Sequence, residues 1–227
     1  YKDYLWLAGH KGFLDLHLRL NIVIEDSATN WDSYDYGEGY FYAGLASIGV
    51  TGFRNSDARY RKMCISELLK DKRVLEIGCN TGFLTVLMSS DAKYVMAFDI
   101  NPYLIQIARV VSERLSTDNI EYDVASFEQW PMMPYDVVVS FANHHTYDQN
   151  TKHSIEQYFQ KCFDLLVADG LFLFESHPHS YEGDGLGQTI DVLQKYFKIE
   201  RQQESQWGNV WDRHRTFVVA RKQSISS

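Results

Sequence analysis

The sequence predicts an α/β fold built on a doubly wound, mostly parallel β-sheet. Two consecutive strand–turn–helix units support this prediction, one in residues 73–89 and the other in residues 93–109. Further short apolar runs at residues 137–139 and 171–174 are typical of strands buried inside such a sheet. With 227 residues, the chain is long enough to bury one complete core and to carry an appendage.

The first unit contains the segment VLEIGCNTGF, residues 74–83. Its apolar residues predict a buried strand that stops abruptly at Gly78. Glu76 interrupts the strand, and because a buried carboxylate is costly without a partner, we expect it to face a partner or a ligand. Gly78 and Gly82 permit a tight turn and a close approach of a ligand to the backbone.

The spacing of these glycines excludes two common nucleotide-binding loops. A dinucleotide fingerprint requires G-x-G-x-x-G, whereas the loop reads G-C-N-T-G from Gly78. A phosphate loop of the NTPase kind requires a lysine after its last glycine, and Gly82 is followed by Phe83. The loop therefore favours a ligand that has a cationic or zwitterionic end and no pyrophosphate.

The second unit is a strand at residues 94–98 that ends in Asp99. Asn101 is suited to cap the following helix, and Pro102 occupies its favoured first position. Asp99 lies 21 residues after Gly78, close to the offset of about 20 residues at which an acid meets ribose hydroxyls. The alternative is a surface acid at a strand end.

The segments VLEIGCNTGF and AFDINP resemble the first two motifs of the class I S-adenosylmethionine-dependent methyltransferases. The resemblance covers roughly residues 56–222 and implies a seven-stranded sheet whose last two strands, YFKIERQ and RTFVVARK, form an antiparallel hairpin. It also implies that S-adenosylmethionine lies across the carboxyl ends of the first strands. One departure is Asn80, where many relatives carry glycine.

The resemblance also assigns cofactor contacts. The loop after the first strand would line methionine and ribose, Asp99 would hold the ribose, and Ile100 would flank the adenine. After a short strand at residues 120–122, Asp123 would accept from the adenine amino group or serve as a turn residue. The predicted cofactor-binding residues are Glu76, Gly78, Cys79, Asn80, Gly82, Asp99, Ile100, Asp123, Val124, Ala125 and Ser140.

Two histidines, His144 and His145, follow the valine-rich strand at residues 137–139, where the chemistry of open α/β sheets is usually found. An imidazole takes a proton from a hydroxyl near neutral pH, so one of them, preferably His145, is the predicted catalytic base. The alternative is that one histidine packs the loop. A base of this kind favours O-methylation of a small-molecule or glycan acceptor, with a sugar or natural-product hydroxyl as the first candidate.

The loop after the next strand reads ESHPHSYEGDGLG and carries His177, His179 and Tyr181. We predict that these three residues bind the acceptor. An exposed loop is the second interpretation, and a metal site that includes Glu175 is the third. We rank the metal site last and predict no bound metal.

Two other functions stay open. Some relatives with this loop methylate phosphate groups at the ends of RNA or glycans, and Arg213, His214 and Arg215 would then bind the phosphate. The second alternative is a cofactor-binding module without catalysis.

Residues 1–55 form a predicted N-terminal appendage, and residues 56–227 form the predicted methyltransferase domain. The aromatic segment from residue 31 to residue 42 is either a lid over the site or a packing layer. Arg54, Arg59 and Arg61 are candidates for the cofactor carboxylate, or else solvated residues at a helix start. Ser56 or Asp57 is the predicted cap of that helix.

Composition narrows the cellular setting and the partners. The net charge of -8 argues against a large nucleic-acid surface, and no apolar run of about 18 residues is present to span a membrane. Cys64, Cys79 and Cys162 fit neither a disulfide framework nor a metal pattern, which favours a reducing, cytoplasmic setting. No secretory leader is visible, but the chain starts at Tyr1, so excision from a larger polypeptide stays open.

Overall fold

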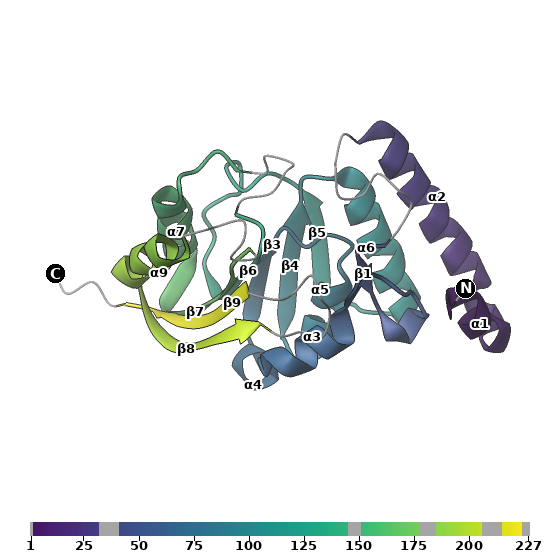
Figure 1. The fold of residues 1–227 in the computed structure, drawn as a ribbon, viewed down its shortest axis with the longest axis horizontal. Helices are drawn as coiled ribbons and strands as arrows, with labels where there is room; N and C mark the ends of the chain where they lie inside the picture. Colours follow the sequence, from purple (N-terminus) through teal and green to yellow (C-terminus); the bar gives the residue numbers. More distant parts are fainter. Residues whose placement is uncertain (1, 32–40, 145–150, 178–184, 206–214, 224–227) are drawn as a thin grey trace.

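The computed structural model describes residues 2–31, 41–144, 151–177, 185–205 and 215–223. Its centre is a seven-stranded sheet with the order β5-β4-β3-β6-β7-β9-β8 (Figure 1). The strands are β3 (Arg73–Ile77), β4 (Tyr94–Asp99), β5 (Ile120–Val124), β6 (Tyr135–Phe141), β7 (Leu166–Glu175), β8 (Phe197–Ser205) and β9 (Arg215–Lys222). Only β9 runs antiparallel to its two neighbours, so the predicted fold with its C-terminal hairpin is confirmed.

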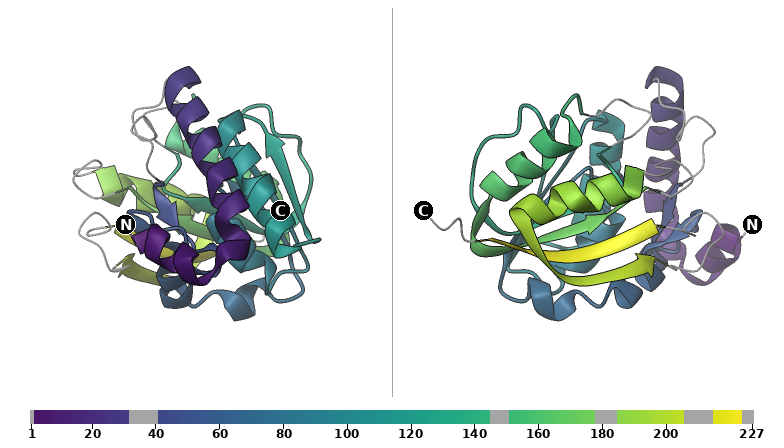
Figure 2. Two further views of the ribbon diagram at one scale, coloured as in Figure 1. Left: turned by 90° about the vertical axis from the view of Figure 1, so that its right-hand side faces the viewer. Right: turned by 60° about the vertical axis from the view of Figure 1, so that its left-hand side comes forward.

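Helices cover both faces of the sheet (Figure 2). The α-helices of the described ranges are α1 (Lys2–Gly9), α2 (Leu14–Asn30), α3 (Ser56–Met63), α4 (Ser66–Leu69), α5 (Phe83–Ser89), α6 (Pro102–Leu115), α7 (Ile155–Asp164) and α9 (Gly185–Tyr196). Along β3, Val74 packs with α3, α4 and α5, whereas Leu75 and Ile77 pack with α7 and α9. This alternation buries both faces of the strand, as expected of a parallel sheet.

Helix caps show how the sequence sets the element boundaries. The Asn101 side chain accepts hydrogen bonds from the backbone N–H groups of Tyr103 and Leu104, which confirms the predicted cap of α6. The predicted cap of α3, at Ser56 or Asp57, is wrong. Asn55 caps that helix, because its side-chain oxygen accepts from the Ala58 N–H at 2.8 Å.

Strand β7 is longer than the predicted segment of residues 171–174. The apolar spacing of residues 155–166 predicts a helix that includes Leu166, but α7 ends at Asp164 and Leu166 already pairs with Tyr135 of β6. The register then shifts before Val137, and Asp169 adopts a left-handed backbone with φ 59°. The irregularity divides the strand, which explains why only its second half shows as an apolar run.

The N-terminal helices lie against the sheet domain. Helix α2 runs alongside α6 (Figure 2), and its buried residues Leu16, Leu20 and Ile24 share one apolar cluster with Leu104 and Ile107. Strand β1 (Ala43–Gly44) pairs in parallel with β2 (Arg54–Asn55), and the short helices η1 (Lys11–Phe13) and η2 (Ala46–Ile48) complete this part. The division at residue 55 stays a prediction.

Among the helices in the described ranges, none has both the length and the apolar character needed to cross a membrane.

Candidate active site

The loop after β3 is fastened to the end of β4. The N–H groups of Gly78 and Cys79 both donate to the Phe98 carbonyl, at 2.9 and 3.0 Å. Gly78 has φ 68°, and a Cβ placed on it would lie 2.8 Å from Nδ2 of Asn143. Glycine is therefore required at this position both by its backbone conformation and by its neighbour. The Cys79 side chain is buried beside Ala97, so only its backbone is suited to line a ligand.

Asn80 occupies the position where many methyltransferases carry glycine. Its φ of 55° is left-handed, a conformation that asparagine tolerates better than most residues. The Asn80 N–H donates to Asp99 at 2.9 Å, and its side-chain oxygen accepts from the Thr81 N–H at 2.7 Å. Gly82, with φ 70°, then starts α5, and a Cβ on it would lie 2.6 Å from the Cβ of Ala108.

Asp99 stands at the carboxyl end of β4, where ribose binding was predicted. Its Oδ2 accepts from the Asn80 N–H at 2.9 Å and its Oδ1 accepts from the Asn101 N–H at 3.0 Å. The two backbone donors orient the carboxylate, and a carboxylate oxygen can accept more than one hydrogen bond. This geometry fits a vicinal diol, and the ribose role stays a prediction.

Glu76 is buried in β3 and has a partner, as its place in the sequence predicted. The Thr85 hydroxyl donates to its carboxylate at 2.5 Å. Burial raises the pKa of Glu76 from 4.5 to about 7, the Asp99 charge adds to the rise, and Thr85 and Arg59 oppose it. A cationic group of a ligand nearby would favour the ionised form.

The backbone N–H groups of Val124 and Ala125, which were predicted to contact the adenine, donate hydrogen bonds within the chain. The Val124 N–H donates to the side chain of Asp123 at 2.8 Å, and the Ala125 N–H donates to the Asp99 carbonyl at 3.0 Å. The Asp123 side chain would have to turn away before Val124 could donate to a ring nitrogen. Ile100 is half-buried beside Asp99. These adenine contacts stay predictions.

Phe127 and Trp130 follow the predicted adenine loop in the sequence, which predicts that they pack in the core, and both are buried. The Phe98 ring stacks on Trp130 with centroids 4.3 Å apart and on Phe127 with centroids 6.4 Å apart. The core assignment of Phe127 and Trp130 is confirmed.

A buried hydrogen-bond network supports the Gly78 loop from β6 and α7. The Ser140 hydroxyl donates to Oδ1 of Asn143 at 2.7 Å, and the Tyr158 hydroxyl donates to the same oxygen at 2.7 Å. The Asn143 amide in turn donates to the Ile77 carbonyl. Ser140, predicted to contact the cofactor, thus holds Asn143, and its cofactor contact stays a prediction.

Sequence reasoning missed the roles of Asn143 and Tyr158. Both are polar residues in apolar surroundings, Asn143 after the valine strand and Tyr158 on the inner face of α7. Buried polar groups are nearly always hydrogen-bonded, so this pattern was the available signal for a buried network.

Two of the predicted active-site histidines lie together. His144 is 2% exposed, and its ring centroid lies 5.3 Å from that of Phe174, 5.4 Å from that of His177 and 6.1 Å from that of Tyr158. The structure therefore brings His144, which follows β6, close to His177, which follows β7; these two rings are called the imidazole pair. His145, His179, Tyr181, Arg213 and His214 lie outside the described residues, as does most of the predicted lid.

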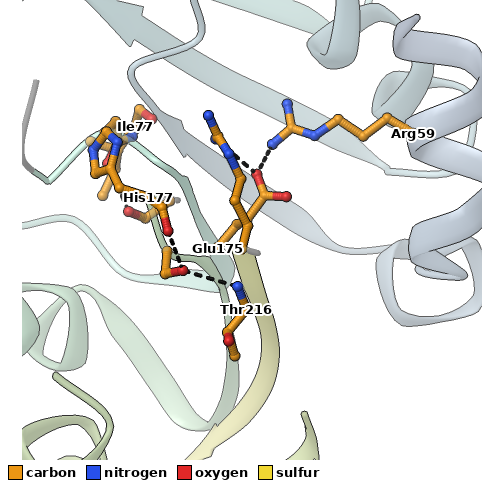
Figure 3. A network of polar contacts seen from close by, with 9 residues as sticks. Arg59, Ile77, Glu175, His177 and Thr216 are labelled. Carbon is orange, nitrogen blue, oxygen red and sulfur yellow. Dashed lines mark hydrogen bonds and ion pairs between the residues drawn. The ribbon is translucent and has the colours of Figure 1, made fainter. Parts of the chain in front are cut away.

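A cluster of charged side chains surrounds Glu175, the last residue of β7 (Figure 3). Arg59 donates to Oε2 of Glu175, and Nη1 of Arg215 lies 3.7 Å from the same oxygen. The buried Arg54 places its guanidinium 4.7 Å from the ring centre of Tyr42. Arg61, the third arginine predicted to meet the cofactor carboxylate, is exposed, and its Nε donates to the backbone of its own helix.

No three histidine, cysteine, aspartate or glutamate side chains converge as a metal site within the described part of the chain. Glu175, which the metal interpretation required, faces guanidinium groups. Cys64, Cys79 and Cys162 are free thiols.

Comparisons with known proteins agree with this geometry. A family model described as a methyltransferase domain matches residues 74–170. A malonyl-[acyl-carrier protein] O-methyltransferase of Acetivibrio thermocellus is 29% identical over 133 residues, 57% of this chain and 44% of that protein. An uncharacterized methyltransferase of Oceanobacillus iheyensis is 25% identical over 170 residues, 71% of this chain and 72% of that protein. The chain spans less than half the length of several curated relatives.

Among solved structures, the N-methyltransferase NodS of Bradyrhizobium japonicum in complex with S-adenosyl-L-homocysteine matches with a TM-score of 0.63 and 15% identity. The match covers 90% of this chain and 99% of NodS, and at this identity it concerns the fold. The strand order, the glycine loop and the family match over residues 74–170 together indicate a methyltransferase domain with the fold of the class I S-adenosylmethionine-dependent methyltransferases.

Proposed function

We propose that the protein methylates an oxygen atom of a small polar acceptor, and that a sugar or natural-product hydroxyl is the first candidate. The residues at the strand ends fit the cofactor, since Asp99 offers a carboxylate that two backbone N–H groups orient, one of them from the neighbouring glycine loop. Bound there, S-adenosylmethionine supplies an electrophilic methyl group on a sulfonium sulfur.

We propose an oxygen acceptor because of the imidazole pair of His144 and His177, whose ring centroids are 5.4 Å apart. The curated and solved relatives include both O- and N-methyltransferases, so their names leave the acceptor atom open. An alcohol must lose its proton as it reacts, and imidazole is the side chain best matched to accept it near neutral pH.

In the proposed reaction the acceptor oxygen bonds to the methyl carbon while the carbon–sulfur bond breaks. The hydroxyl proton passes to an imidazole of His144 or its neighbour His145. His177, with His179 and Tyr181, orients the acceptor. Because the step is an in-line displacement, positioning of the acceptor contributes a large part of the acceleration.

The direct test is a transfer assay with methyl-labelled S-adenosylmethionine and a panel of sugars, hydroxylated natural products, phosphorylated compounds and amines. We expect label in an ether that resists alkaline hydrolysis. Label found solely on amines would contradict the proposal. Label in a base-labile carboxylate ester, or label released by a phosphodiesterase or phosphatase, would point to an acidic acceptor instead.

The variants His144→Ala and His177→Ala separate the two proposed roles. Loss of a base should lower turnover by about 10²–10⁴-fold, remove the rise of rate with pH through the histidine range, and leave cofactor affinity unchanged. Loss of an orienting contact should mainly raise the acceptor KM. His10→Ala, at the exposed end of α1, is the matched control. Full turnover in both site variants would make these histidines structural.

An acidic acceptor, such as a phosphate group of a small molecule, a glycan or an RNA end, is the second candidate. It is favoured by Arg215, which is buried beside Arg59 and Glu175. A module that binds the cofactor without catalysis would bind S-adenosylhomocysteine and transfer no label to any class of acceptor.

A further inference from the structure

Two guanidinium groups share one carboxylate oxygen at the edge of the site. Arg59 donates to Oε2 of Glu175, while Nη1 of Arg215 lies 3.7 Å from that oxygen, beyond hydrogen-bond distance (Figure 3). The Glu175 side chain is fully buried, and those of Arg59 and Arg215 are 12% and 6% exposed. The three residues come from α3, β7 and β9, so the cluster is a product of the tertiary fold.

Arg215 has donor capacity that the described residues do not use. Its Nε and Nη1 are buried, and within the described ranges neither donates a hydrogen bond. Burial lowers the pKa of Arg215, and the charge of Arg54 lowers it further. A buried cation with unused donors is costly, and an anion placed against it would relieve that cost.

The surroundings hold the two guanidinium groups in place. The Arg59 guanidinium lies 5.2 Å from the ring centre of Phe141, which packs on Phe217 with centroids 6.0 Å apart. Just after the end of β7, the Ser176 N–H donates to the carbonyl of Thr216 in β9, and the Thr216 N–H donates to the Ser176 hydroxyl, both at 2.9 Å. These contacts fix the backbone on either side of the cluster, and a fixed planar guanidinium is suited to bind an oxyanion through two N–H groups.

We infer that Arg59 and Arg215 form a subsite for an oxyanion group of the acceptor, a phosphate or a carboxylate, and that Glu175 holds the two guanidinium groups in position. Glu175 is the last residue of β7 and His177 follows two residues later, so the subsite and the imidazole pair are joined by the same short stretch of chain at the end of this strand. That the anion is part of the acceptor rests on the proposed methyl transfer, whereas the binding of an anion to the two arginines does not.

Calorimetric titration of inorganic phosphate into protein saturated with S-adenosylhomocysteine tests the subsite. The saturated protein should bind phosphate, and Arg215→Gln should weaken that binding at least roughly tenfold while S-adenosylhomocysteine affinity stays unchanged. Glu175→Gln should tighten phosphate binding, because it removes the negative charge that competes for both guanidinium groups. Arg221→Gln is the matched control, since Arg221 lies on the same strand but pairs with Glu200 near the surface.

Arg215→Lys is the second variant, for the case in which Arg215→Gln does not fold. Lysine keeps the positive charge and lacks the planar guanidinium, so its phosphate affinity should lie between those of the parent and Arg215→Gln. Phosphate that binds only before S-adenosylhomocysteine is added would assign the arginines to the cofactor carboxylate and overturn the inference. Equal phosphate binding by the parent and Arg215→Gln, or none by the saturated parent, would also overturn it. Asp99→Ala separates this inference from the proposed function. The variant should bind the cofactor more weakly and should still bind phosphate as the parent does.

Discussion

The Thr85 hydroxyl donates a 2.5 Å hydrogen bond to the Glu76 carboxylate, and this contact joins the first helix of the nucleotide-binding unit to its first strand. Both side chains are buried. Burial outweighs the hydrogen bond and raises the pKa of Glu76 from 4.5 to about 7. The strand that leads into the glycine loop therefore carries a carboxyl group that changes its charge near neutral pH.

Folding stability should fall as Glu76 ionises. An acid whose pKa is higher in the folded chain than in the unfolded chain stabilises the fold while it is protonated. This stabilisation is complete below the unfolded value of 4.5 and is lost as the pH rises through about 7. The cofactor-free protein should lose up to about 3 kcal/mol of unfolding free energy from this group between acid and alkaline pH.

Glu76→Gln isolates that contribution, because glutamine keeps an acceptor for Thr85 and cannot ionise. Urea unfolding of the parent and the variant at a series of pH values measures the difference between them. The variant should show a flatter dependence on pH across the neutral range. Parallel stability curves for the two proteins would contradict a raised pKa at this position.

Asp99→Ala should weaken S-adenosylmethionine binding at least roughly tenfold, because it removes charge-assisted hydrogen bonds to the ribose. It should also lower the unfolding free energy, since the carboxylate accepts the N–H groups of Asn80 and Asn101. Calorimetry measures the affinity and denaturant titration measures the stability.

Asp136→Ala provides the control for the second effect. Asp136 accepts the Arg73 N–H at 2.8 Å, at the opposite end of β3, so it supports the same sheet away from the site. This variant should lose stability and keep cofactor affinity. If Asp99→Ala kept full affinity for S-adenosylmethionine, the prediction that Asp99 binds the ribose would be wrong.

Gly78→Ala should lose cofactor affinity and stability together. The new methyl group would lie 2.8 Å from Nδ2 of Asn143, and a left-handed backbone costs a non-glycine residue about 1–2 kcal/mol. Gly187→Ala is the opposite case, because Gly187 lies in α9 with no other heavy atom within 4 Å of a new Cβ. It should gain about 0.5–1 kcal/mol in thermal or chemical unfolding and leave cofactor binding unchanged. If Gly78→Ala and Gly187→Ala changed stability and cofactor affinity equally, the close contact between Gly78 and Asn143 would be contradicted.

The sequence predicted those features that depend on near neighbours in the chain. The strand that ends at Asp99 and the cap at Asn101 follow from short patterns, and both were found. The cap at Asn55 was missed because Asn55, Ser56 and Asp57 are all good capping residues, and the choice depends on where β2 ends.

The features that the sequence did not predict depend on contacts between distant segments. Asn143 lies against Gly78 only because β6 is the sheet neighbour of β3. Arg59 and Arg215 meet at Glu175 because β9 enters the sheet antiparallel, next to β7. A pattern within one segment carries no information about such pairs.

Tyr158→Phe tests whether the buried network controls the glycine loop. The change removes one hydroxyl, which donates to Oδ1 of Asn143 at 2.7 Å and lies 2.9 Å from the Ser140 hydroxyl. We expect a loss of about 1–2 kcal/mol in unfolding free energy and a severalfold loss of S-adenosylhomocysteine affinity, because Asn143 packs against Gly78. Tyr60→Phe removes a comparable hydrogen bond to Asp91, away from the glycine loop, so it should reduce stability alone. If both tyrosine variants kept full affinity, the network would serve folding only, and the loop would owe its shape to its own bonds with Phe98 and Asp99.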